Sequence, residues 1–544
     1  MLKAKMNDFE QLVQESYRAL LDISPNVGDR EQFFPLMFRL LPETVVDKET
    51  LQQIEINELF RAMDHTKTLA GAATLYRSLI QPLSSLDLIL AKQESLQELE
   101  SNDRLRDAVF EYLMEIKKSG KRISWVDGDH ALDLFLNGGI NEFNPYPDFK
   151  AAMKTGTNLA DAAVKIPKPE SMYLEIIVSA LQNFSSTESY RLMRGPVYRT
   201  FRGLRSKEDI NFLTPRWKFI PQYIIIPPVI LPISVLSAAF DPFGIGISSR
   251  LAALLATVGG CSLLYMPMFK PKIDYKTAIV PLESRIGTDP EFQLAFDSLG
   301  RLDELASFYE YARVMPGNMK IPRIVVAENH HFMASNLRNP ILGKYNQSYV
   351  PSDVELDNCK LTFLTGPNSG GKTTLGKTIA QTQIMAQIGC YVSADDAEIS
   401  VADRISYQYY MPDRLGHPEG DFGVNLARTR DIFYAATPKS LVILNVLASG
   451  TTSHEELEQA YGILRDFSRI GNNTIYVTHR YELAERFKRE GLGQFLRTDF
   501  ADGKPTFIFV PGISTESHAA DIAKRIGFSP QDRNTHLADG GYLK

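Results

Sequence analysis

The chain has 544 residues, enough for about three to five domains of ordinary size, and its 44% apolar and 23% charged content excludes wholesale disorder. A net charge of −6 excludes a chain that is basic overall, as many nucleic-acid binders are, although a local basic patch stays open. Three cysteines (Cys261, Cys359 and Cys390) are typical of a reducing compartment, and a mean hydropathy of −0.16 excludes a polytopic membrane protein but not one or two spans.

Residues 1–130 predict a helical domain. The first 15 residues are polar and of mixed charge, without the apolar stretch of a signal peptide, so we expect a cytoplasmic chain. Long stretches then lack glycine and proline, and apolar side chains recur at helical spacing, as at Leu59, Phe60 and Met63. Residues 131–215 are expected to continue as a helical and basic segment.

Residues 216–270 predict a two-helix transmembrane hairpin. The runs 219–240 and 251–269 contain no charged residue, and each is long enough to cross a hydrocarbon core of roughly 30 Å. Basic residues flank the pair on both outer sides, which places both flanks in the cytoplasm. Two buried core helices are the alternative, and the prolines of the first run count against a regular helix there. We therefore expect a cytoplasmic chain tethered to the inner (cytoplasmic) membrane through 219–269.

A basic stretch precedes this apolar pair. Residues 191–207 hold five arginines and one lysine, interleaved with Tyr198 and Phe201. Three interpretations stay open: phosphate contact with base stacking, attraction to anionic lipid beside the membrane, and a solvated helix face. The membrane interpretation is favoured if the hairpin is present.

Residues 271–345 predict a helical lever and lead-in, and residues 346–544 predict an α/β domain. In the second segment short β-rich runs alternate with helical stretches, the runs being KLTFLT, LVILNV, TIYVT and TFIFV. This alternation is the pattern of a parallel sheet whose strands are joined by crossover helices.

The strongest motif is a phosphate-binding P-loop between the first of these strands and a helix. It matches the pattern GxxxxGK[ST], and its residues are Gly366, Pro367, Asn368, Ser369, Gly370, Gly371, Lys372, Thr373 and Thr374. Glycines let backbone N–H groups surround phosphate oxygens, and the following helix N-terminus adds partial positive charge. We expect Lys372 to contact the β- and γ-phosphates of ATP, and Thr373 to offer its hydroxyl to Mg²⁺.

The acidic strand end that usually accompanies a P-loop is altered. The strand 441–446 ends in Asn445 and Val446, where a magnesium-binding carboxylate and a water-orienting carboxylate are expected. Asn445 can still accept a hydrogen bond from magnesium-bound water, whereas the Val446 side chain has no polar atom with which to polarise the attacking water. His479 ends the next strand and could sense the γ-phosphate, the alternative being a surface histidine. The candidate catalytic residues are therefore His479 and Asn445, and Thr373 and Asn445 are the candidate metal contacts.

Several segments, in order along the chain, resemble the MutS family of DNA mismatch-repair ATPases, which belongs to the ABC-type class. They are TGPNSGGKTT, LVILNVLASGTTS and residues 388–405, 476–487 and 511–528, together with 59–99 and 299–312, which resemble the MutS helical core and lever. The resemblance implies an α/β P-loop (ABC-type) ATPase domain preceded by an all-α core and lever domain, here with the apolar helical hairpin inserted. It also implies that Tyr349, in YVPSDVEL, stacks on adenine.

The resemblance implies an ATP-dependent conformational switch that forms a homodimer through its ATPase domains and acts on DNA in a mismatch-repair-related role. Departures from the family pattern modify this expectation. The residues before position 59 are too few for a mismatch-reading domain, and Gly420 and Asn425 replace a serine and an acid of the signature segment. Together with Asn445 and Val446, these departures predict ATP binding with weakened hydrolysis. The alternative is a membrane-anchored regulatory or scaffold ATPase without nucleic-acid binding.

Overall fold

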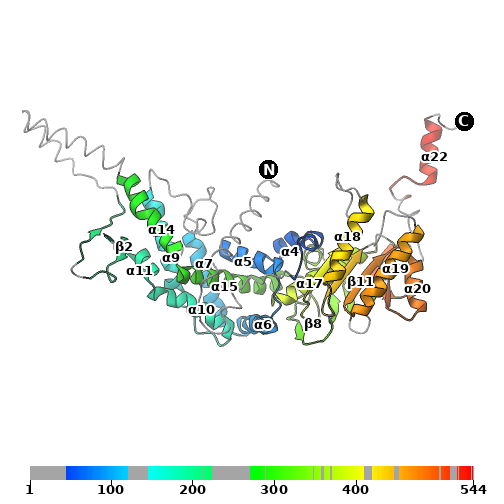
Figure 1. Ribbon diagram of the computed structural model, residues 1–544, viewed down its shortest axis with the longest axis horizontal. Helices are drawn as coiled ribbons and strands as arrows, with labels where there is room; N and C mark the ends of the chain where they lie inside the picture. Colours follow the sequence, from blue (N-terminus) through cyan, green and yellow to red (C-terminus); the bar gives the residue numbers. More distant parts are fainter. Residues whose placement is uncertain are drawn as a thin grey trace, which may run out of the picture. The chain divides into compact units, whose positions relative to one another are not determined.

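The computed structural model divides the chain into two units, each made of several segments. The described residues of unit 1 fall within 66–75 and 97–306, and those of unit 2 within 45–65, 76–96 and 307–544 (Figure 1). The structure describes residues 45–120, 145–222 and 270–542, with internal gaps at 202, 212–213, 288, 347, 357–359, 368–369, 410–419, 446–452, 502–503, 515–523, 525 and 541. Three helices carry residues of both units, namely α5 (Leu69–Ile80), α6 (Leu86–Ser101) and α15 (Pro290–Val314).

Unit 1 is largely helical and closes around aromatic side chains. Its other helices are α7 (Asp103–Gly120), α9 (Pro145–Ala163), α10 (Met172–Asn183), η2 (Phe184–Ser186), α11 (Glu188–Arg194), η3 (Tyr275–Ile279) and α14 (Val280–Gly287). Phe184 is fully buried, and its ring centre lies 5.9 Å from that of Tyr190 and 5.7 Å from that of Phe292. Such ring pairs add to the free energy of burial because the ring edges and faces carry opposite partial charge.

A buried carboxylate joins the two segments of unit 1 that resemble the helical core and the lever. Asp303 of α15 accepts hydrogen bonds from the backbone N–H groups of Lys67 (2.9 Å) and Thr68 (2.7 Å) and from the Thr68 hydroxyl (2.6 Å). These groups lie at the start of α5, where N–H groups lack partners within the helix. Gly71 is required there, because a Cβ would lie 2.2 Å from an Asp303 carboxylate oxygen.

A small antiparallel sheet stands where the sequence predicted a helical and basic segment. Gly195 ends α11 with a φ of +67°, and Pro196 cannot continue the helix. The chain then forms β1 (Val197–Thr200), which pairs with β2 (Gly203–Ser206) on one side and β3 (Trp217–Lys218) on the other. The core and lever domain, expected to be all-α, is therefore only largely helical, because this sheet follows the helices α9, α10 and α11.

Unit 2 contains two sheets. The larger one has the order β13-β12-β7-β11-β10-β9, and its strands are parallel except β13, which runs antiparallel to β12. Its strands are β7 (Leu361–Thr365), β9 (Ile405–Gln408), β10 (Leu441–Asn445), β11 (Asn473–Thr478), β12 (Gln494–Ala501) and β13 (Lys504–Pro511). The smaller sheet has the order β4-β8-β5-β6, with β4 (Arg323–Val325), β5 (Phe332–Leu337), β6 (Ser352–Glu355) and β8 (Asp396–Ser400). The parallel sheet predicted from the alternating pattern is confirmed for KLTFLT, LVILNV and TIYVT, which form β7, β10 and β11, whereas TFIFV lies in the antiparallel strand β13.

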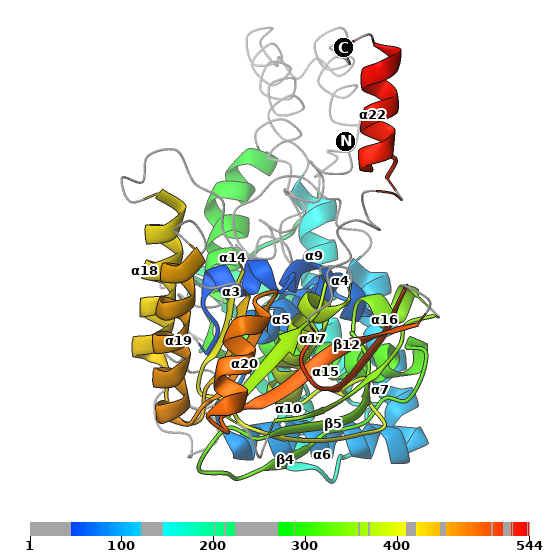
Figure 2. The same ribbon diagram turned by 90° about the vertical axis from the view of Figure 1, so that its right-hand side faces the viewer.

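Helices cover both faces of the larger sheet. The helices of unit 2 are α3 (Lys48–Gln53), α4 (Ile56–Met63), α16 (Leu342–Tyr345), α17 (Lys372–Gln387), α18 (Gly420–Ala435), α19 (Ser453–Ile470), α20 (Tyr481–Arg489) and α22 (Pro530–Asp539). Val442 and Leu444 of β10 pack into one core with α18, α19 and α20, which lie along the same face (Figure 2). Ile443, which points to the other face, meets α17 at Gly376, where a Cβ would lie 3.2 Å from its side chain.

The predicted transmembrane hairpin falls mainly on residues 223–269, which lie outside the described residues. In the ranges that the structure does describe, no helix is both long enough and apolar enough to cross a membrane. The hairpin is therefore not among the elements seen.

Phe363→Ala should lower the free energy of unfolding of unit 2 by about 3–5 kcal/mol. Phe363 is fully buried in β7, and its ring centre lies 5.9 Å from Tyr476, 5.1 Å from Phe487 and 5.2 Å from Phe495. Denaturant unfolding followed by circular dichroism measures the loss. Tyr434→Ala is the control, because Tyr434 is exposed on α18 and its loss should change stability by no more than about 0.5 kcal/mol. Equal losses at the two positions would contradict this account of the core.

Candidate nucleotide-binding site

The P-loop connects the central strand β7 to the N-terminus of α17, as the sequence predicted. Gly366 has a φ of +128° and Gly371, the N-cap of α17, has a φ of +82°, backbone conformations that residues other than glycine rarely adopt. Gly370 is required for space, because a Cβ there would lie 2.5 Å from the Thr498 hydroxyl oxygen. Asn368 and Ser369 lie outside the described residues. The glycines of the loop therefore let its backbone N–H groups approach a bound phosphate without a clash from side chains.

The Lys372 side chain folds back over the loop. Its Nζ donates to the carbonyl oxygens of Gly366 and Pro367, both at 2.7 Å, and the residue is only 3% exposed. Burial lowers the pKa of Lys372 to about 8, because the charged ammonium has lost most of its water. Two neutral carbonyls only partly replace that water, so an anionic group at this point would be strongly attracted.

His479, directly after β11, lies against the same carbonyl. Its Nδ1 is 3.2 Å from the Gly366 oxygen, which can only accept, so Nδ1 carries the hydrogen. Burial, and next the charge of Lys372, lower the pKa of His479 below its ordinary 6.5, so the ring is neutral at pH 7. In this tautomer Nε2 has a free lone pair. It can accept a hydrogen bond from water, but it cannot donate one to a phosphate.

The two candidate metal contacts also lie together. Asn445, at the end of β10, is 4% exposed, and its Nδ2 donates to the Thr373 hydroxyl oxygen at 3.1 Å. Rotating the amide by 180° would place Oδ1 there instead, accepting the hydroxyl hydrogen and leaving the Thr373 lone pairs for a cation. Val446 lies outside the described residues.

The remaining predicted residues lie along α17. The Thr374 carbonyl accepts from the Thr378 hydroxyl at 2.8 Å, within the helix. Burial raises the pKa of Tyr349, and a hydrogen bond to Thr378 partly opposes the rise, so this ring packs against α17. Thr378 follows Lys372 by about 9 Å along the helix axis. Tyr349 therefore lies one to two turns from the loop, on the helix that begins there.

Three contributors to the site were not predicted. Thr498 of β12 donates to the Gly370 carbonyl at 2.9 Å, and Phe507 of β13 lies 3.4 Å from where a Gly371 Cβ would stand. Arg480 pairs with Glu456 of α19 at 2.7 Å, beside His479. The sequence of β12, QFLRTDFA, has no regular apolar alternation, and only the sheet order places Thr498 beside the loop.

Comparison with known proteins agrees with this geometry. The family model described as MutS domain V matches residues 362–529. The chain is 31% identical over 247 residues to the DNA mismatch repair protein MutS of Caldicellulosiruptor bescii, which is 43% of this chain and 28% of that protein. It is 29% identical over 260 residues to the DNA mismatch repair protein MutS of Myxococcus xanthus, 45% of this chain and 28% of that protein. It is 36% identical over 155 residues to the DNA mismatch repair protein MSH3 of Kluyveromyces lactis, 28% of this chain and 15% of that protein.

The matched segments span less than a third of each of these three relatives. The resemblance predicted from the motifs is confirmed for the ATPase domain, which follows a largely helical region.

ATP affinity should fall as the pH rises through the pKa of Lys372, which is about 8. Phosphate needs the ammonium form, and between about pH 7 and about pH 9 that form of the free protein decreases about tenfold. Isothermal titration calorimetry should therefore show the Kd for ATP rising about tenfold over this range. Lys372→Arg is the control, because its guanidinium stays charged and its weaker binding should not vary with pH. A flat profile for the unaltered protein would contradict the assigned pKa.

Proposed function

We propose that this protein is an ATP-dependent dimeric switch that acts on DNA and hydrolyses ATP slowly, because residues 362–529 match the family model of MutS domain V. The observation that carries the proposal is the desolvated Lys372 ammonium, bound only to loop carbonyls at the N-terminus of α17. Within the described residues no carboxylate pairs with it. Nucleotide phosphates supply the missing negative charge.

The residues around the loop fit ATP and Mg²⁺. The loop N–H groups and Lys372 would hold the phosphates, and Thr373 with Asn445 would hold the cation. ATP supplies a transferable γ-phosphate, and Mg²⁺ offsets its charge. Asn445 provides a neutral oxygen in place of a carboxylate, which supports weaker cation binding than is usual for P-loop enzymes.

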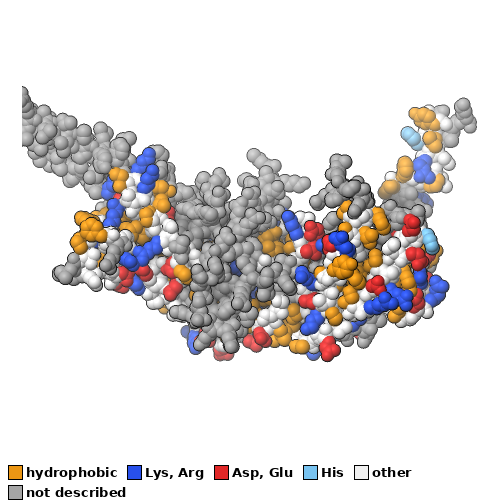
Figure 3. All heavy atoms as spheres, viewed as in Figure 1, with side chains coloured by type: hydrophobic (Ala, Val, Ile, Leu, Met, Phe, Trp, Pro, Cys, Tyr) orange, Lys and Arg blue, Asp and Glu red, His pale blue; other side chains and the backbone are white. Residues whose placement is uncertain are grey.

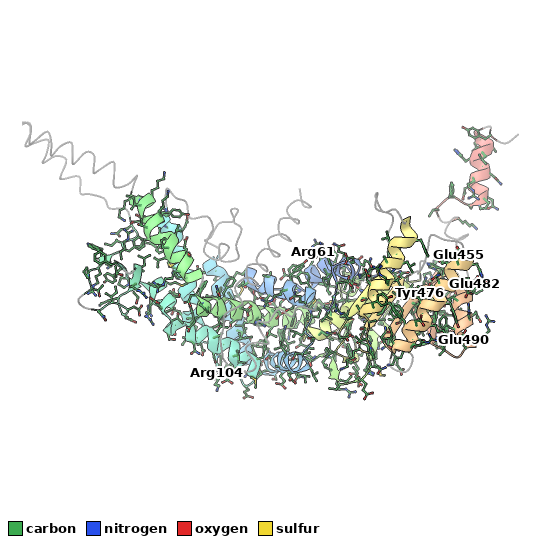
Figure 4. The ribbon with its side chains drawn as sticks, viewed as in Figure 1. Arg61, Arg104, Glu455, Tyr476, Glu482 and Glu490 are labelled. Carbon is green, nitrogen blue, oxygen red and sulfur yellow. The ribbon has the colours of Figure 1, made fainter. Side chains whose placement is uncertain are left out.

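Slow hydrolysis is supported by the groups available to orient water. Val446 has no polar atom, and Glu456 is held by Arg480. Neutral His479 can accept a hydrogen bond from water through Nε2. Glu455, in the first turn of α19 (Figure 4), is the first carboxylate along the chain after Val446. Of the two ionisable side chains that the described structure places against the loop, Lys372 and His479, only the neutral imidazole can act as a base, and it is a weak one, so turnover should be slow.

Action on DNA is supported by the relatives, whose names describe DNA mismatch repair. We propose that two copies meet through their ATPase domains. The long helix α15 carries residues of both units, so it offers a continuous element through which a change at the nucleotide could reach unit 1.

Lys372→Ala should abolish ATP binding, because the phosphates lose both a charge and hydrogen-bond donors. The purified full-length protein is titrated with a fluorescent ATP analogue, and its ATP turnover is measured with and without DNA. DNA binding is measured separately at low and high salt. Lys377→Ala, between one and two turns further along α17, is the matched control, because the Lys377 ammonium pairs with Glu55 at 2.8 Å and not with the loop. Undiminished binding by Lys372→Ala would overturn the nucleotide site, whereas no DNA binding at low salt would overturn only the DNA part.

Val446→Glu should raise the rate of hydrolysis by restoring a carboxylate beside Asn445 that can orient water. Phosphate release under saturating ATP measures the rate. Val446→Gln is the control, because glutamine is similar in size to glutamate but has no basic carboxylate oxygen, so hydrolysis by this variant should stay slow. If the unaltered protein already turns over at about 1–10³ s⁻¹, typical of enzymes, the idea that Val446 weakens hydrolysis is wrong.

A membrane-anchored regulatory ATPase without nucleic-acid binding is a second candidate. The observation that favours it is the sequence of residues 223–269, which holds only Asp241 and Arg250 as charged residues. Fractionation of cells should then leave the full-length protein with the membranes after washes with high salt and alkaline carbonate, and release it with detergent. Recovery in the aqueous fraction without detergent would overturn this candidate.

A further inference from the structure

One buried carboxylate of unit 1, that of Asp274, contacts the elements that border residues 223–269. Asp274 is 6% exposed and binds Arg199 of β1 at 2.6 Å, Lys270 at 2.6 Å and the Tyr146 hydroxyl of α9 at 2.7 Å. The Lys270 ammonium also lies 4.9 Å from the centre of the Tyr146 ring. The small sheet, α9 and the helical turn that starts at Lys270 are therefore held at one point.

The two ends of segment 223–269 leave unit 1 at this same point. Lys270 donates from Nζ to the carbonyl oxygens of Ile220 (3.1 Å) and Gln222 (3.3 Å). The last described residues before the segment are thus tied to the first described residue after it. An almost charge-free stretch of sequence therefore begins and ends at one place on unit 1.

Exposed apolar side chains stand beside this point. Phe201, in the turn between β1 and β2, is 83% exposed, and Trp217 of β3 is 62% exposed. Their ring centres lie 6.1 Å apart, edge to face, and Ile220 is also exposed. Keeping two large aromatic rings in water is unfavourable, so this arrangement indicates a surface that is covered when the protein works.

Exposed basic side chains accompany these rings in the same part of unit 1. Arg216 lies over the Tyr198 ring at 5.5 Å, and Arg216, Lys218 and Lys276 are all exposed. The stretches 196–222 and 270–280 hold nine basic and three acidic residues, whereas the whole chain has a net charge of −6. Hydrophobic and basic side chains gather over the part of unit 1 that carries β2 and α14 (Figure 3). We call the exposed set Phe201, Arg216, Trp217, Lys218, Ile220 and Lys276 the aromatic–basic face.

The same charge pattern does not favour a DNA track. Arg191 pairs with Asp209 at 3.0 Å, Arg199 with Asp274 and Arg205 with Glu188 at 2.9 Å. Three of the five arginines in 191–207 are therefore bound to acids of their own unit and would have to leave them to reach phosphates. The exposed cations that remain lie next to the point where the apolar stretch leaves.

We propose that the aromatic–basic face binds the headgroup region of an anionic lipid bilayer. Tryptophan rings favour the level of the headgroups, and lysine and arginine are attracted to the negative surface potential of anionic lipids. The position of the face at both ends of a charge-free stretch selects lipid as its partner. This binding rests on described residues, and it does not require residues 223–269 to cross the bilayer.

The test uses Trp217 as the reporter in full-length protein carrying Trp125→Phe, which removes the only other tryptophan. The protein is titrated with phosphatidylcholine vesicles with or without phosphatidylserine, and with vesicles whose lipids are brominated near the headgroup. We expect the Trp217 emission to shift to the blue and to be quenched by the brominated lipids, with tighter binding when phosphatidylserine is present.

Lys218→Gln with Lys276→Gln should weaken binding to phosphatidylserine vesicles about 30-fold, at about fivefold for each lysine near an anionic surface. The matched control is Lys117→Gln with Lys118→Gln at the end of α7, which removes the same charge elsewhere on unit 1 and should leave binding unchanged. Circular dichroism of both double variants verifies that they fold. Equal weakening by the two pairs would overturn the proposal, because net charge alone would then explain binding.

The outcomes separate this proposal from membrane anchoring. Binding that resists salt, with Trp217 unshifted, would mean that 223–269 anchors the protein while the face stays in water, which overturns the proposal alone. Binding that requires phosphatidylserine, shifts Trp217 and is reversed by salt supports the face without an anchor. Quenching of Trp217 by a single-stranded oligonucleotide, without a response to vesicles, would make the face a nucleic-acid surface and overturn the proposal. A lack of response to both partners would overturn it as well.

Discussion

The carbonyl oxygen of Gly366 is the point on which the candidate site depends. It accepts hydrogen bonds from Lys372, which begins the helix after the loop, and from His479, which ends the neighbouring strand. Only glycine adopts the backbone conformation at this position without strain, because its φ is +128°. One carbonyl therefore sets the direction of the lysine ammonium and selects the tautomer of the histidine.

The parallel sheet explains why these groups meet. β7 lies between β12 and β11, and β10 lies beyond β11, so the carboxyl ends of the strands bring Thr365, Asn445 and Thr478 to one edge of the sheet. The apolar core beneath this edge, centred on Phe363, keeps the strands in register while the edge carries polar groups. The result is a partly charged site in which the buried Lys372 attracts phosphate more strongly than it would in water.

The same principle, a buried charge that organises its surroundings, recurs in unit 1. Asp303 fixes the start of α5 from a distant helix, and Asp274 joins the small sheet to α9 and Lys270. In both places the carboxylate is surrounded by several donors, which is the condition under which a buried charge is tolerated. Neither carboxylate could be assigned this role from the chain, because its partners, apart from Lys270 beside Asp274, lie far away in the sequence.

The chain by itself determined the P-loop, the parallel order of strands and helices in 346–544 and the likeness to MutS, because local patterns of glycine, apolar and β-branched residues dictate them. It also brought forward Lys372, Thr373, Asn445 and His479 as site residues. Only the tertiary structure decided that 197–218 is a sheet, that Thr498 and Phe507 crowd the loop, and that neutral His479 presents a free Nε2. These outcomes depend on which strands lie side by side and on how far each group is removed from water, and both are set by contacts between residues distant in the sequence.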